Sequence, residues 1–462
     1  MDQSKVIING VFTDRKFYRR MLTLAIPVAI QNFIGSFLNM VDTVMVGQLG
    51  ETAIAAVGIA NQYFFFFMMF LIGLSAGCSV FIAQFWGTQD LKNIRRILGV
   101  GLGSALTISA VFMVVGLLFP RQIIMIFNND PLVIVEGSRY LRIVLGSYLF
   151  TGIAFVYVFA LRSIGNTLLP MAVSTVALVC NVFFNYMLIF GKFGAPAMGV
   201  AGAAVATVIA RVVESSVLVV VIYRHREVLA ATLSELLDFD LGFIRKAYRT
   251  ILPVLLNEIC WALASLVYAV VYGRMGTQAV ATIQIVNTIT NLFMVVIFGM
   301  ANAAAVMIGN SIGAGEIRQA KDYGKRFSVM AVAAGIILGL LLAVFSPYLL
   351  NAFKVSAMVR HSTQNIIYIV AIVFFIRIFN IIAIVGILRG GGDARGSFLL
   401  EGFTMWFIGV PLTVAGAFVL RLSVHLVYSL SLCEELTKAF LCLWRLRSGR
   451  WIHNVTHRFG GG

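Results

Sequence analysis

Long apolar blocks alternate with short polar connections along almost the whole chain. A helix needs about 20 mainly apolar residues to cross the hydrocarbon core of a bilayer. The apolar runs are continuous and do not alternate with polar positions, which excludes a membrane β-barrel. The pattern therefore predicts an all-α polytopic membrane protein. Its twelve expected spans are residues 21–46, 54–86, 97–119, 140–161, 168–190, 198–223, 251–273, 279–308, 327–350, 366–388, 398–420 and 422–444.

The composition supports this fold class. Of 462 residues, 60% are hydrophobic and 12% are charged, whereas a soluble domain carries about 25% charged residues. The chain is therefore neither a soluble enzyme nor a disordered protein. The cysteines form no CxxC pair and lie in or beside the apolar blocks, so we expect small core side chains and no disulfides or metal ligands. They are Cys78, Cys180, Cys260, Cys433 and Cys442.

The net charge of +16 follows the membrane topology. Twenty-five of the 35 Lys and Arg residues fall in the amino terminus, the even-numbered connections and the carboxyl terminus. Eight are assigned to the odd-numbered connections, with Arg142 at the beginning of span 4 counted among them. Lys438, near the end of span 12, is counted with the carboxyl terminus, and Arg211 and Arg377 are assigned to the interior of spans. By the positive-inside rule, both termini are expected in the cytoplasm, in a plasma (inner) membrane protein. No basic stripe lies on a soluble domain, so no nucleic-acid partner is expected.

The longest polar stretch inside the chain, residues 224–249, combines alternating charge with periodic leucines. This pattern predicts an interfacial cytoplasmic segment between two halves. Gly99 and Gly103 form a GxxxG within a span, which favours close helix packing.

The two halves repeat each other. At an offset of 226 residues many Gly, Pro and Ala positions coincide, and after one slip the offset is 227. Six spans in each half return the chain to its starting side, so the repeats are parallel. We expect two six-helix lobes, residues 1–230 and 231–462, related by a pseudo-two-fold axis along the membrane normal around a central cleft. Matching pairs include Pro27 with Pro253, Gly47 with Gly273, Gly73 with Gly299, Gly87 with Gly313, Pro120 with Pro347 and Arg162 with Arg389.

Several short motifs, weak singly but specific together, occur along the chain. They are residues 24–27 and 42–47 in span 1, Ala83, Gln84 and Gly87 at the end of span 2, residues 162–167 and 389–393 after spans 4 and 10, residues 202–207 in span 6, and residues 447–451. With the duplicated twelve-span layout, these motifs resemble the MATE (multidrug and toxic compound extrusion) family over nearly the whole chain. The resemblance implies a secondary-active exporter working by alternating access, with Na⁺ or H⁺ as coupling ion and no other cofactor.

Asp42 is the first ionisable candidate within the spans. It lies about 30 Å along span 1, in the outer part of the bilayer. Its repeat partner is Tyr268, so the repeated architecture does not require an acid. The resemblance implies that Asp42 carries cation coupling together with polar residues of spans 5 and 6. The matching positions are Asn181, Asn185 and Thr207. Their oxygens suit Na⁺ or a protonatable acid; a structural, hydrogen-bonded acid is the alternative.

Glu258 in span 7 is the second candidate, and its repeat partner is Asn32. The resemblance implies an acid here in one branch of the family, often with another acid in span 10. Span 10 of this chain instead carries Arg377 and Asn380. Glu258 is therefore expected to bind a cationic substrate, take a proton, or pair with Arg377. The residues expected to line the cleft are Gln31, Asn32, Tyr268, Gln284, Arg377 and Asn380.

Other charged groups have simpler interpretations. Arg211 and Glu214 are spaced i, i+3 and are expected to pair. The repeated Arg162 and Arg389 connections are expected to be structural turns, in which Gly165 and Gly390–Gly392 allow positive φ. The aromatic run at residues 63–67 favours packing. Three further acids, expected to face the cleft or to pair with loop arginines, are Glu401, Glu434 and Glu435.

The expected substrates are small amphipathic organic cations, handled by a monomer surrounded by lipid. The alternative within the same superfamily is a flippase or exporter of lipid-linked precursors or metabolites. Anionic head groups would require several basic residues in the cleft, and only Arg211 and Arg377 are assigned to the interior of spans. An integral-membrane enzyme is disfavoured because no HExxH or paired-acid cluster is present. The chain also has no GxxxxGK[ST] loop for ATP-driven transport.

Overall fold

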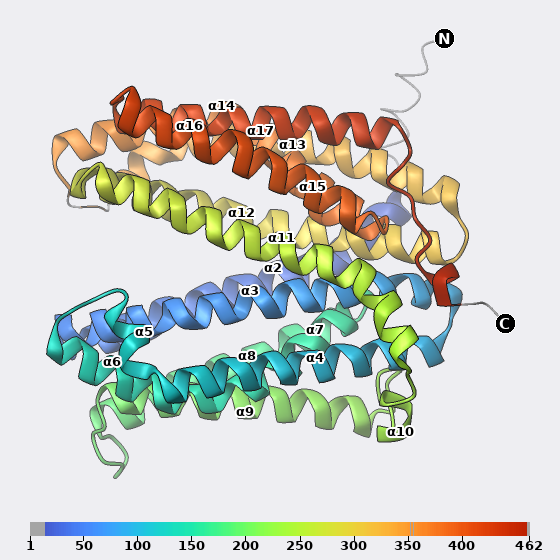
Figure 1. The fold of residues 1–462 in the computed structure, drawn as a ribbon, viewed down its shortest axis with the longest axis horizontal. Helices are drawn as coiled ribbons and strands as arrows, with labels where there is room; N and C mark the ends of the chain where they lie inside the picture. The colour runs from blue at the N-terminus through green and yellow to red at the C-terminus, as the bar shows by residue number, and fades with distance from the viewer. Residues whose placement is uncertain (1–13, 352, 354, 460–462) are drawn as a thin grey trace. The chain divides into compact units, whose positions relative to one another are not determined.

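The computed structural model describes residues 14–351, 353 and 355–459. Within these ranges the chain is helical, and its β-structure is limited to one bridge between Gly392 and Ile452 (Figure 1). Lys5 and Lys354, both used in the charge argument, lie outside the described residues.

Twelve long helical segments follow the predicted order. Eleven are long and apolar enough to cross a membrane. The remaining one, α17 (Val424–Arg447), is 24 residues long but carries Glu434, Glu435 and Lys438. The eleven are α2 (Arg15–Gly47), α3 (Glu51–Thr88), α4 (Leu91–Leu118), α6 with η1 and α7 (Pro131–Ser163), α8 (Leu168–Phe190), α9 (Val200–Arg224), α11 (Leu241–Arg274), α12 (Thr277–Gly313), α13 (Ile317–Leu350), α14 with η2 (Ala357–Leu388), and α15 with η3, α16 and η4 (Ala394–Val419).

The chain forms two compact units. The amino-terminal unit comprises Ile30–Leu255; the carboxyl-terminal unit comprises the residues up to Ala29 and those from Leu256 onward. The expected lobes, residues 1–230 and 231–462, are contiguous in sequence, whereas these units are not. The first half of α2 belongs to the carboxyl-terminal unit, and the first half of α11 belongs to the amino-terminal unit. Both exchanges occur two residues after a proline inside the helix, Pro27 or Pro253. A proline there removes a helical hydrogen bond and permits a bend.

Glycines of the repeat allow each exchanged half-helix to pack closely. In the amino-terminal unit, a Cβ at Gly73 would lie 2.7 Å from the Cα of Leu255. In the carboxyl-terminal unit, a Cβ at Gly299 would lie 2.5 Å from the carbonyl oxygen of Ala25. Contacts this close exclude any side chain. The repeated Gly73 and Gly299 are therefore explained by packing against α11 and α2.

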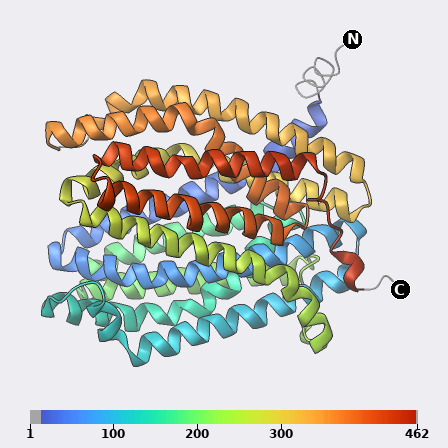
Figure 2. The ribbon, with the colours of Figure 1, turned by 45° about the horizontal axis from the view of Figure 1, so that its top comes forward.

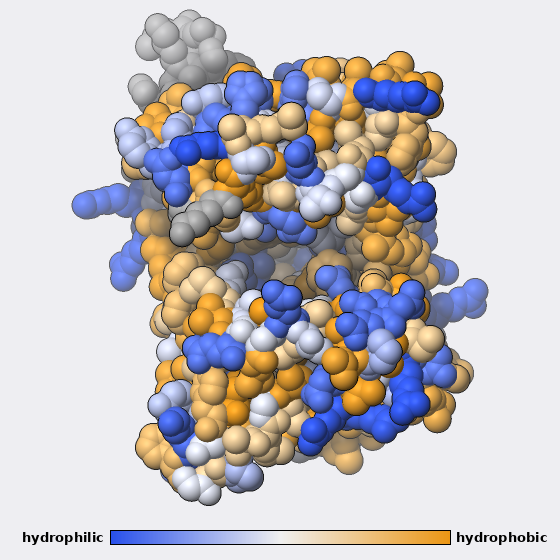
Figure 3. All heavy atoms as spheres, turned by 90° about the vertical axis from the view of Figure 1, so that its left-hand side faces the viewer, coloured by the Kyte–Doolittle hydropathy of each residue, from blue (hydrophilic) through white to orange (hydrophobic). Residues whose placement is uncertain are grey.

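Within each unit the helices run alongside one another (Figures 1 and 2), and α8 with α9 and α13 with α14 form the longest contacts. Large apolar side chains stay exposed in mid-helix, as at Ile372 (74% exposed) and Phe440 (70%). Such surface is unfavourable in water and suits lipid, so the protein is an integral membrane protein. Polar side chains gather in patches at the helix ends that lie opposite the termini (Figure 3).

The aromatic run of α3 packs as expected. Phe67 stacks on Tyr148 with ring centroids 4.3 Å apart, and both side chains are fully buried. Tyr63 and Phe64 also contact Tyr148. These rings fill the core of the amino-terminal unit.

The polar segment after α9 is held against α4. Its short helix α10 (Leu233–Leu236) begins with a capping box formed by Thr232 and Glu235. Glu235 pairs with Arg95, and Asp238 pairs with Arg96 at 2.8 Å. A hydrogen bond from Arg96 holds the pKa of Asp238 below its ordinary value. The segment is thus tied to α4 by charge.

Gly99 permits this docking. A Cβ at Gly99 would overlap the carbonyl oxygen of Leu236, whereas one at Gly103 would meet nothing within 4 Å. The prediction that this glycine pair marks close helix packing is therefore confirmed at Gly99, which packs on helix α10, and wrong at Gly103. Gly99 receives the α10 segment, and Gly103 faces open space.

Replacing Gly99 by Val is expected to displace α10, because the new side chain overlaps Leu236. Overpacking of this kind costs about 1–3 kcal/mol. Hydrogen exchange should become faster over residues 232–240 in Gly99→Val. Gly103→Val is the matched control and should leave exchange there unchanged; equal effects of the two variants would contradict the assignment.

The carboxyl-terminal tail packs on the glycine loop after η2. The backbone N–H of His453 donates to Gly391 O at 2.7 Å, and Trp451 is buried. A Cβ at Gly391 would lie 2.5 Å from Trp451. Positive φ is confined to Gly392 within this loop, and to Gly165 in the loop after α7. The expectation that the glycines of these two loops allow positive φ is confirmed at Gly165 and Gly392, whereas Gly390 and Gly391 permit the close approach of neighbouring backbone and side chains.

Candidate functional site

The Asp42 group lies within the amino-terminal unit. Asn185 on α8 donates its Nδ2 to Asp42 Oδ1 at 2.5 Å and to Asn181 Oδ1 at 2.7 Å. Asn181 and Asn185 are each 1% exposed and lie one turn apart on the same face of α8. Asp42 is half-buried on α2. The structure thus brings together three of the four residues proposed for cation coupling.

Thr207 reaches the same group through a residue that the sequence analysis missed. Its hydroxyl donates to Ala203 O at 3.0 Å. It is also hydrogen-bonded to Tyr140, whose side chain interacts electrostatically with Asp42. Tyr140 is 5% exposed on α6. A tyrosine at the beginning of an apolar span carries no sequence signal for this role, because only the packing of α6 against α9 places it.

The group formed by Asp42, Asn181 and Asn185 has more hydrogen-bond acceptors than donors. Asn185 uses its amide nitrogen for both neighbours, and its buried Oδ1 has no partner. Together with the Asp42 carboxylate and Asn181, this forms a set of hard oxygen atoms, the kind that binds Na⁺ or other hard cations. Protonation of Asp42 would satisfy the same excess of acceptors. The geometry therefore suits a single small positive charge.

A chain of hydrogen bonds runs through the same unit from α7 to α9. Arg162 Nη2 donates to Gln31 Oε1 at 2.6 Å, and Gln31 Nε2 donates to Ser174 Oγ at 2.8 Å. Ser174 Oγ donates to Glu214 at 3.2 Å, and Arg211 pairs with Glu214 at 2.6 Å. The predicted Arg211–Glu214 pair is confirmed. Arg162 lies near the end of α7 with only 7% exposure, so this arginine joins helices as well as ending one.

In the carboxyl-terminal unit Glu258 pairs with Arg389 at 2.7 Å. The expectation that Arg377 would be its ion-pair partner is wrong. Arg389 directly follows η2, and Glu258 lies on α11 one to two turns after Pro253. Arg377 instead interacts electrostatically with Glu435, and Asn380 donates to the Glu435 carboxylate at 2.7 Å.

A buried lysine lies among the acids of α17. Lys438 is 4% exposed and pairs with Glu434 at 2.7 Å. Glu434 also accepts a hydrogen bond from Tyr268 at 3.0 Å. Counting Lys438 with the cytoplasmic tail was therefore wrong. Glu434 and Glu435 were expected to face the cleft or to pair with loop arginines. The i, i+4 spacing within α17 supplies the partner of Glu434 instead.

The π-helical segment η3 (Met405–Gly409) makes room for this pair. A Cβ at Gly409 would overlap both the Glu434 carboxylate and the Tyr268 hydroxyl. Two other residues proposed to line the cleft, Asn32 and Gln284, form no side-chain hydrogen bond with a described residue. Asn32 is half-buried, and Gln284 is exposed.

The model of the MatE family matches residues 27–187 and 253–415. The two matches correspond to the two halves of the repeat and cover most of the chain. The protein belongs to the MATE family. Its members are transport proteins, and the chain is therefore a MATE transporter with the twelve-helix, two-lobe fold that the sequence predicts.

Relatives of this MATE protein match over nearly their full lengths. An uncharacterized transporter, YisQ, of Bacillus subtilis is 25% identical over 94% of each chain. The probable multidrug resistance protein NorM of Thermotoga maritima is 24% identical over 94% of this chain and 93% of its own. The multidrug resistance protein MdtK of Yersinia pseudotuberculosis is 25% identical over 85% of this chain and 86% of its own.

Solved structures share the fold. The Vibrio cholerae MATE transporter VcmN in its bent form has a TM-score of 0.84 at 18% identity, covering 95% of this chain and 99% of its own. A MATE protein in complex with MaL6 has a TM-score of 0.84 at 20% identity, covering 93% of this chain and 96% of its own.

Proposed function

We propose that this MATE transporter exports amphipathic organic cations in exchange for Na⁺ or H⁺. The names of relatives such as NorM and MdtK support multidrug export. The observation that carries the coupling is the Asp42 group, with its unpartnered Asn185 oxygen. A small cation binding there contributes to transport only if it binds one conformation of the protein more tightly than the other.

The coupling ion binds to the Asp42 carboxylate and the amides of α8, and Thr207 and Tyr140 hold the neighbouring helices. Asp42 lies on the part of α2 beyond the Pro27 bend, so neutralising it changes the contacts of one half of that helix. Alternating access then follows from the different contacts of α2 in the two states. No cofactor other than the ion takes part.

The distribution of basic groups favours cationic over anionic substrates. Arg162 is bound to Gln31, Arg211 to Glu214, Arg389 to Glu258 and Lys438 to Glu434. A flippase for anionic head groups would require uncommitted basic side chains. We propose a monomer in the plasma (inner) membrane with both termini cytoplasmic. The beginning of α2 and the last described residues lie at the same end of the carboxyl-terminal unit (Figures 1 and 2).

Purified protein in liposomes, with Na⁺ and pH gradients imposed separately, tests the proposal. We expect accumulation of a fluorescent organic cation under one of the two gradients, with collapse by the matching ionophore. Transport of an anionic lipid analogue in place of the cation, or transport under neither gradient, would contradict the proposal.

A further inference from the structure

One contact recurs in both units with different chemistry. In the amino-terminal unit, Gln31 Nε2 donates to Ser174 Oγ at 2.8 Å. In the carboxyl-terminal unit, Asn257 Nδ2 donates to Glu401 Oε2 at 2.7 Å. Asn257 follows Gln31 by 226 residues, and Glu401 follows Ser174 by 227, the two offsets of the repeat. The carboxyl-terminal unit thus has an acid where the other unit has a serine.

The amide oxygens of these two contacts differ as well. Gln31 Oε1 is bound by Arg162. The repeat partner of Arg162 is Arg389, which pairs instead with Glu258. As a result, Asn257 Oδ1 has no partner although Asn257 is only 2% exposed. A buried amide oxygen without a donor is costly, which indicates that the donor comes from a ligand.

Glu401 also has no salt bridge within the described residues, and Asn257 is its hydrogen-bond donor. Glu258 pairs with Arg389, and Glu434 pairs with Lys438. Lys438 interacts electrostatically with Glu401, but its hydrogen bond goes to Glu434. The Glu401 carboxylate and the Asn257 amide oxygen therefore carry negative charge that no salt bridge with a described residue neutralises.

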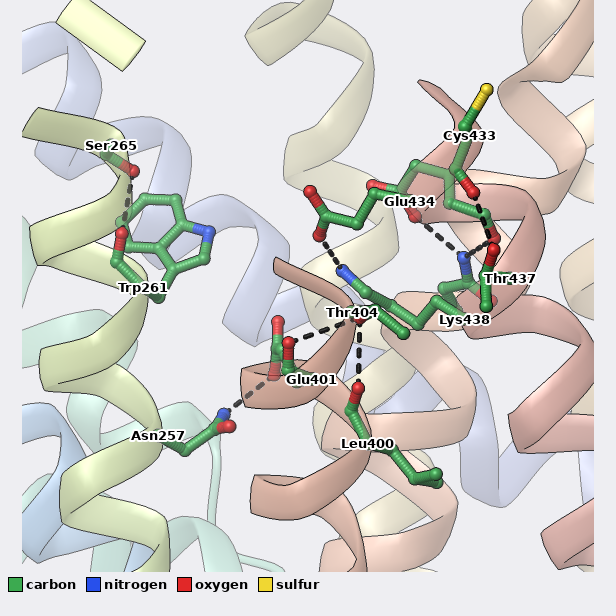
Figure 4. Close-up of polar contacts among 12 residues, drawn as sticks. Asn257, Trp261, Ser265, Leu400, Glu401, Thr404, Cys433, Glu434, Thr437 and Lys438 are labelled. Atoms are coloured by element: carbon green, nitrogen blue, oxygen red, sulfur yellow. Dashed lines mark hydrogen bonds and ion pairs between the residues drawn. The ribbon is translucent and has the colours of Figure 1, made fainter. Parts of the chain in front are cut away.

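An aromatic ring completes the arrangement. Figure 4 shows Asn257 on α11 directed at Glu401 on α15, with Trp261 one turn further along α11 on the side facing α15. Trp261 is 41% exposed, whereas Asn257 is buried. An indole and a carboxylate on facing helices attract organic cations through cation–π and charge interactions. A hydrated alkali ion must give up water to reach such a ring, so in water it gains less than a large, weakly hydrated organic cation does.

We propose that Glu401, Asn257 and Trp261 form a binding subsite for the cationic group of the substrate. This inference rests on the proposed export of organic cations and assigns that charge to the carboxyl-terminal unit, apart from the coupling site at Asp42. Glu401 supplies the counter-charge, Asn257 Oδ1 accepts from a donor hydrogen where the substrate has one, and Trp261 covers the cation with its ring.

The subsite is tested by binding to the purified full chain in detergent, without any gradient. Isothermal titration with tetraphenylphosphonium measures the affinity for a permanent organic cation. Glu401→Gln is expected to weaken binding about tenfold or more, and Trp261→Ala about three- to tenfold, while Trp261→Phe retains most of the affinity because it keeps a ring. Glu316→Gln, at an exposed acid, and Trp444→Ala, at an exposed tryptophan, are the matched controls and should bind as the unmodified protein does.

Three further measurements separate the explanations. Size-exclusion chromatography and thermal unfolding must show Glu401→Gln to be folded, and binding of neutral triphenylphosphine oxide should be the same with and without this change. Asp42→Asn should still bind tetraphenylphosphonium. The binding result is therefore independent of whether Asp42 couples transport to an ion. Unchanged tetraphenylphosphonium affinity in Glu401→Gln would overturn the subsite. So would titration with Na⁺ showing Glu401-dependent binding of that ion while the organic cation binds elsewhere.

Discussion

Asp42→Asn is expected to abolish ion-driven export while the protein is still made and folded. The carboxylate is the only charged member of the group formed with Asn181 and Asn185. An ion that moves a two-state equilibrium from about 1:99 to 99:1 must bind one state about 10⁴-fold more tightly than the other. Amide oxygens alone are not expected to supply that difference, so the asparagine variant should stay unresponsive to an imposed gradient.

The measurement is uptake of a fluorescent cation into liposomes holding the variant, under the gradient that drives the unmodified protein. Glu51→Gln, at an exposed acid of the same unit, is the control and should transport normally. Full gradient-driven uptake by Asp42→Asn would remove Asp42 from the coupling step. Asn185→Leu should also impair coupling, because it removes the donor to Asp42 and the unpartnered oxygen together.

Breaking the Glu258–Arg389 pair from one side is expected to have the largest effect on stability. The two side chains are 16% and 7% exposed and lie 2.7 Å apart. Glu258→Leu leaves the guanidinium of Arg389 buried without a counter-charge, a change that costs about 3–5 kcal/mol. The apparent melting temperature of the detergent-purified protein should fall clearly.

Removing both charges should restore most of that loss. In Glu258→Leu with Arg389→Met no unpaired charge remains, and apolar replacements of a buried pair are often neutral or better. Glu258→Gln is expected to be milder than Glu258→Leu, because Arg162 already rests on the neutral amide of Gln31 in the other unit. If the double variant melted no higher than Glu258→Leu, the two residues would not be coupled as the structure indicates.

The sequence predicted most of the residues that form the candidate sites, but it did not predict which side chains pair with one another. The spacing of Asn181 and Asn185 places both on one helix face, and the contact with Asp42 agrees with the grouping proposed from the family resemblance. For Glu258, pairing with Arg377 was one of three roles left open by the sequence, because both residues lie in spans. In the structure its partner is Arg389, which directly follows η2, because the packing of the helices determines which cation lies within reach of Glu258.

Lys438 is a second residue whose partners the sequence did not predict. A lysine near the carboxyl end of a chain looks like one more cytoplasmic cation. Only the packing of α17 against α14 and α15 shows that it is enclosed among Glu401, Glu434 and Glu435. Tyr140 and the unpartnered oxygen of Asn257 were likewise invisible, since neither residue type nor spacing records what lies opposite a side chain on another helix.

The sequence alone determined the all-α membrane class, the duplication and the helix order, because burial in lipid demands long apolar runs and a duplicated gene keeps its glycines and prolines in register. It also showed that Asp42 and Glu258 lack charged counterparts in the repeat. Tertiary structure decided which half-helices are exchanged, which acid meets which base, and which polar atoms stay unpartnered. Those outcomes depend on helix bends and on side-chain reach between elements far apart in the chain, and the sequence pattern carries neither.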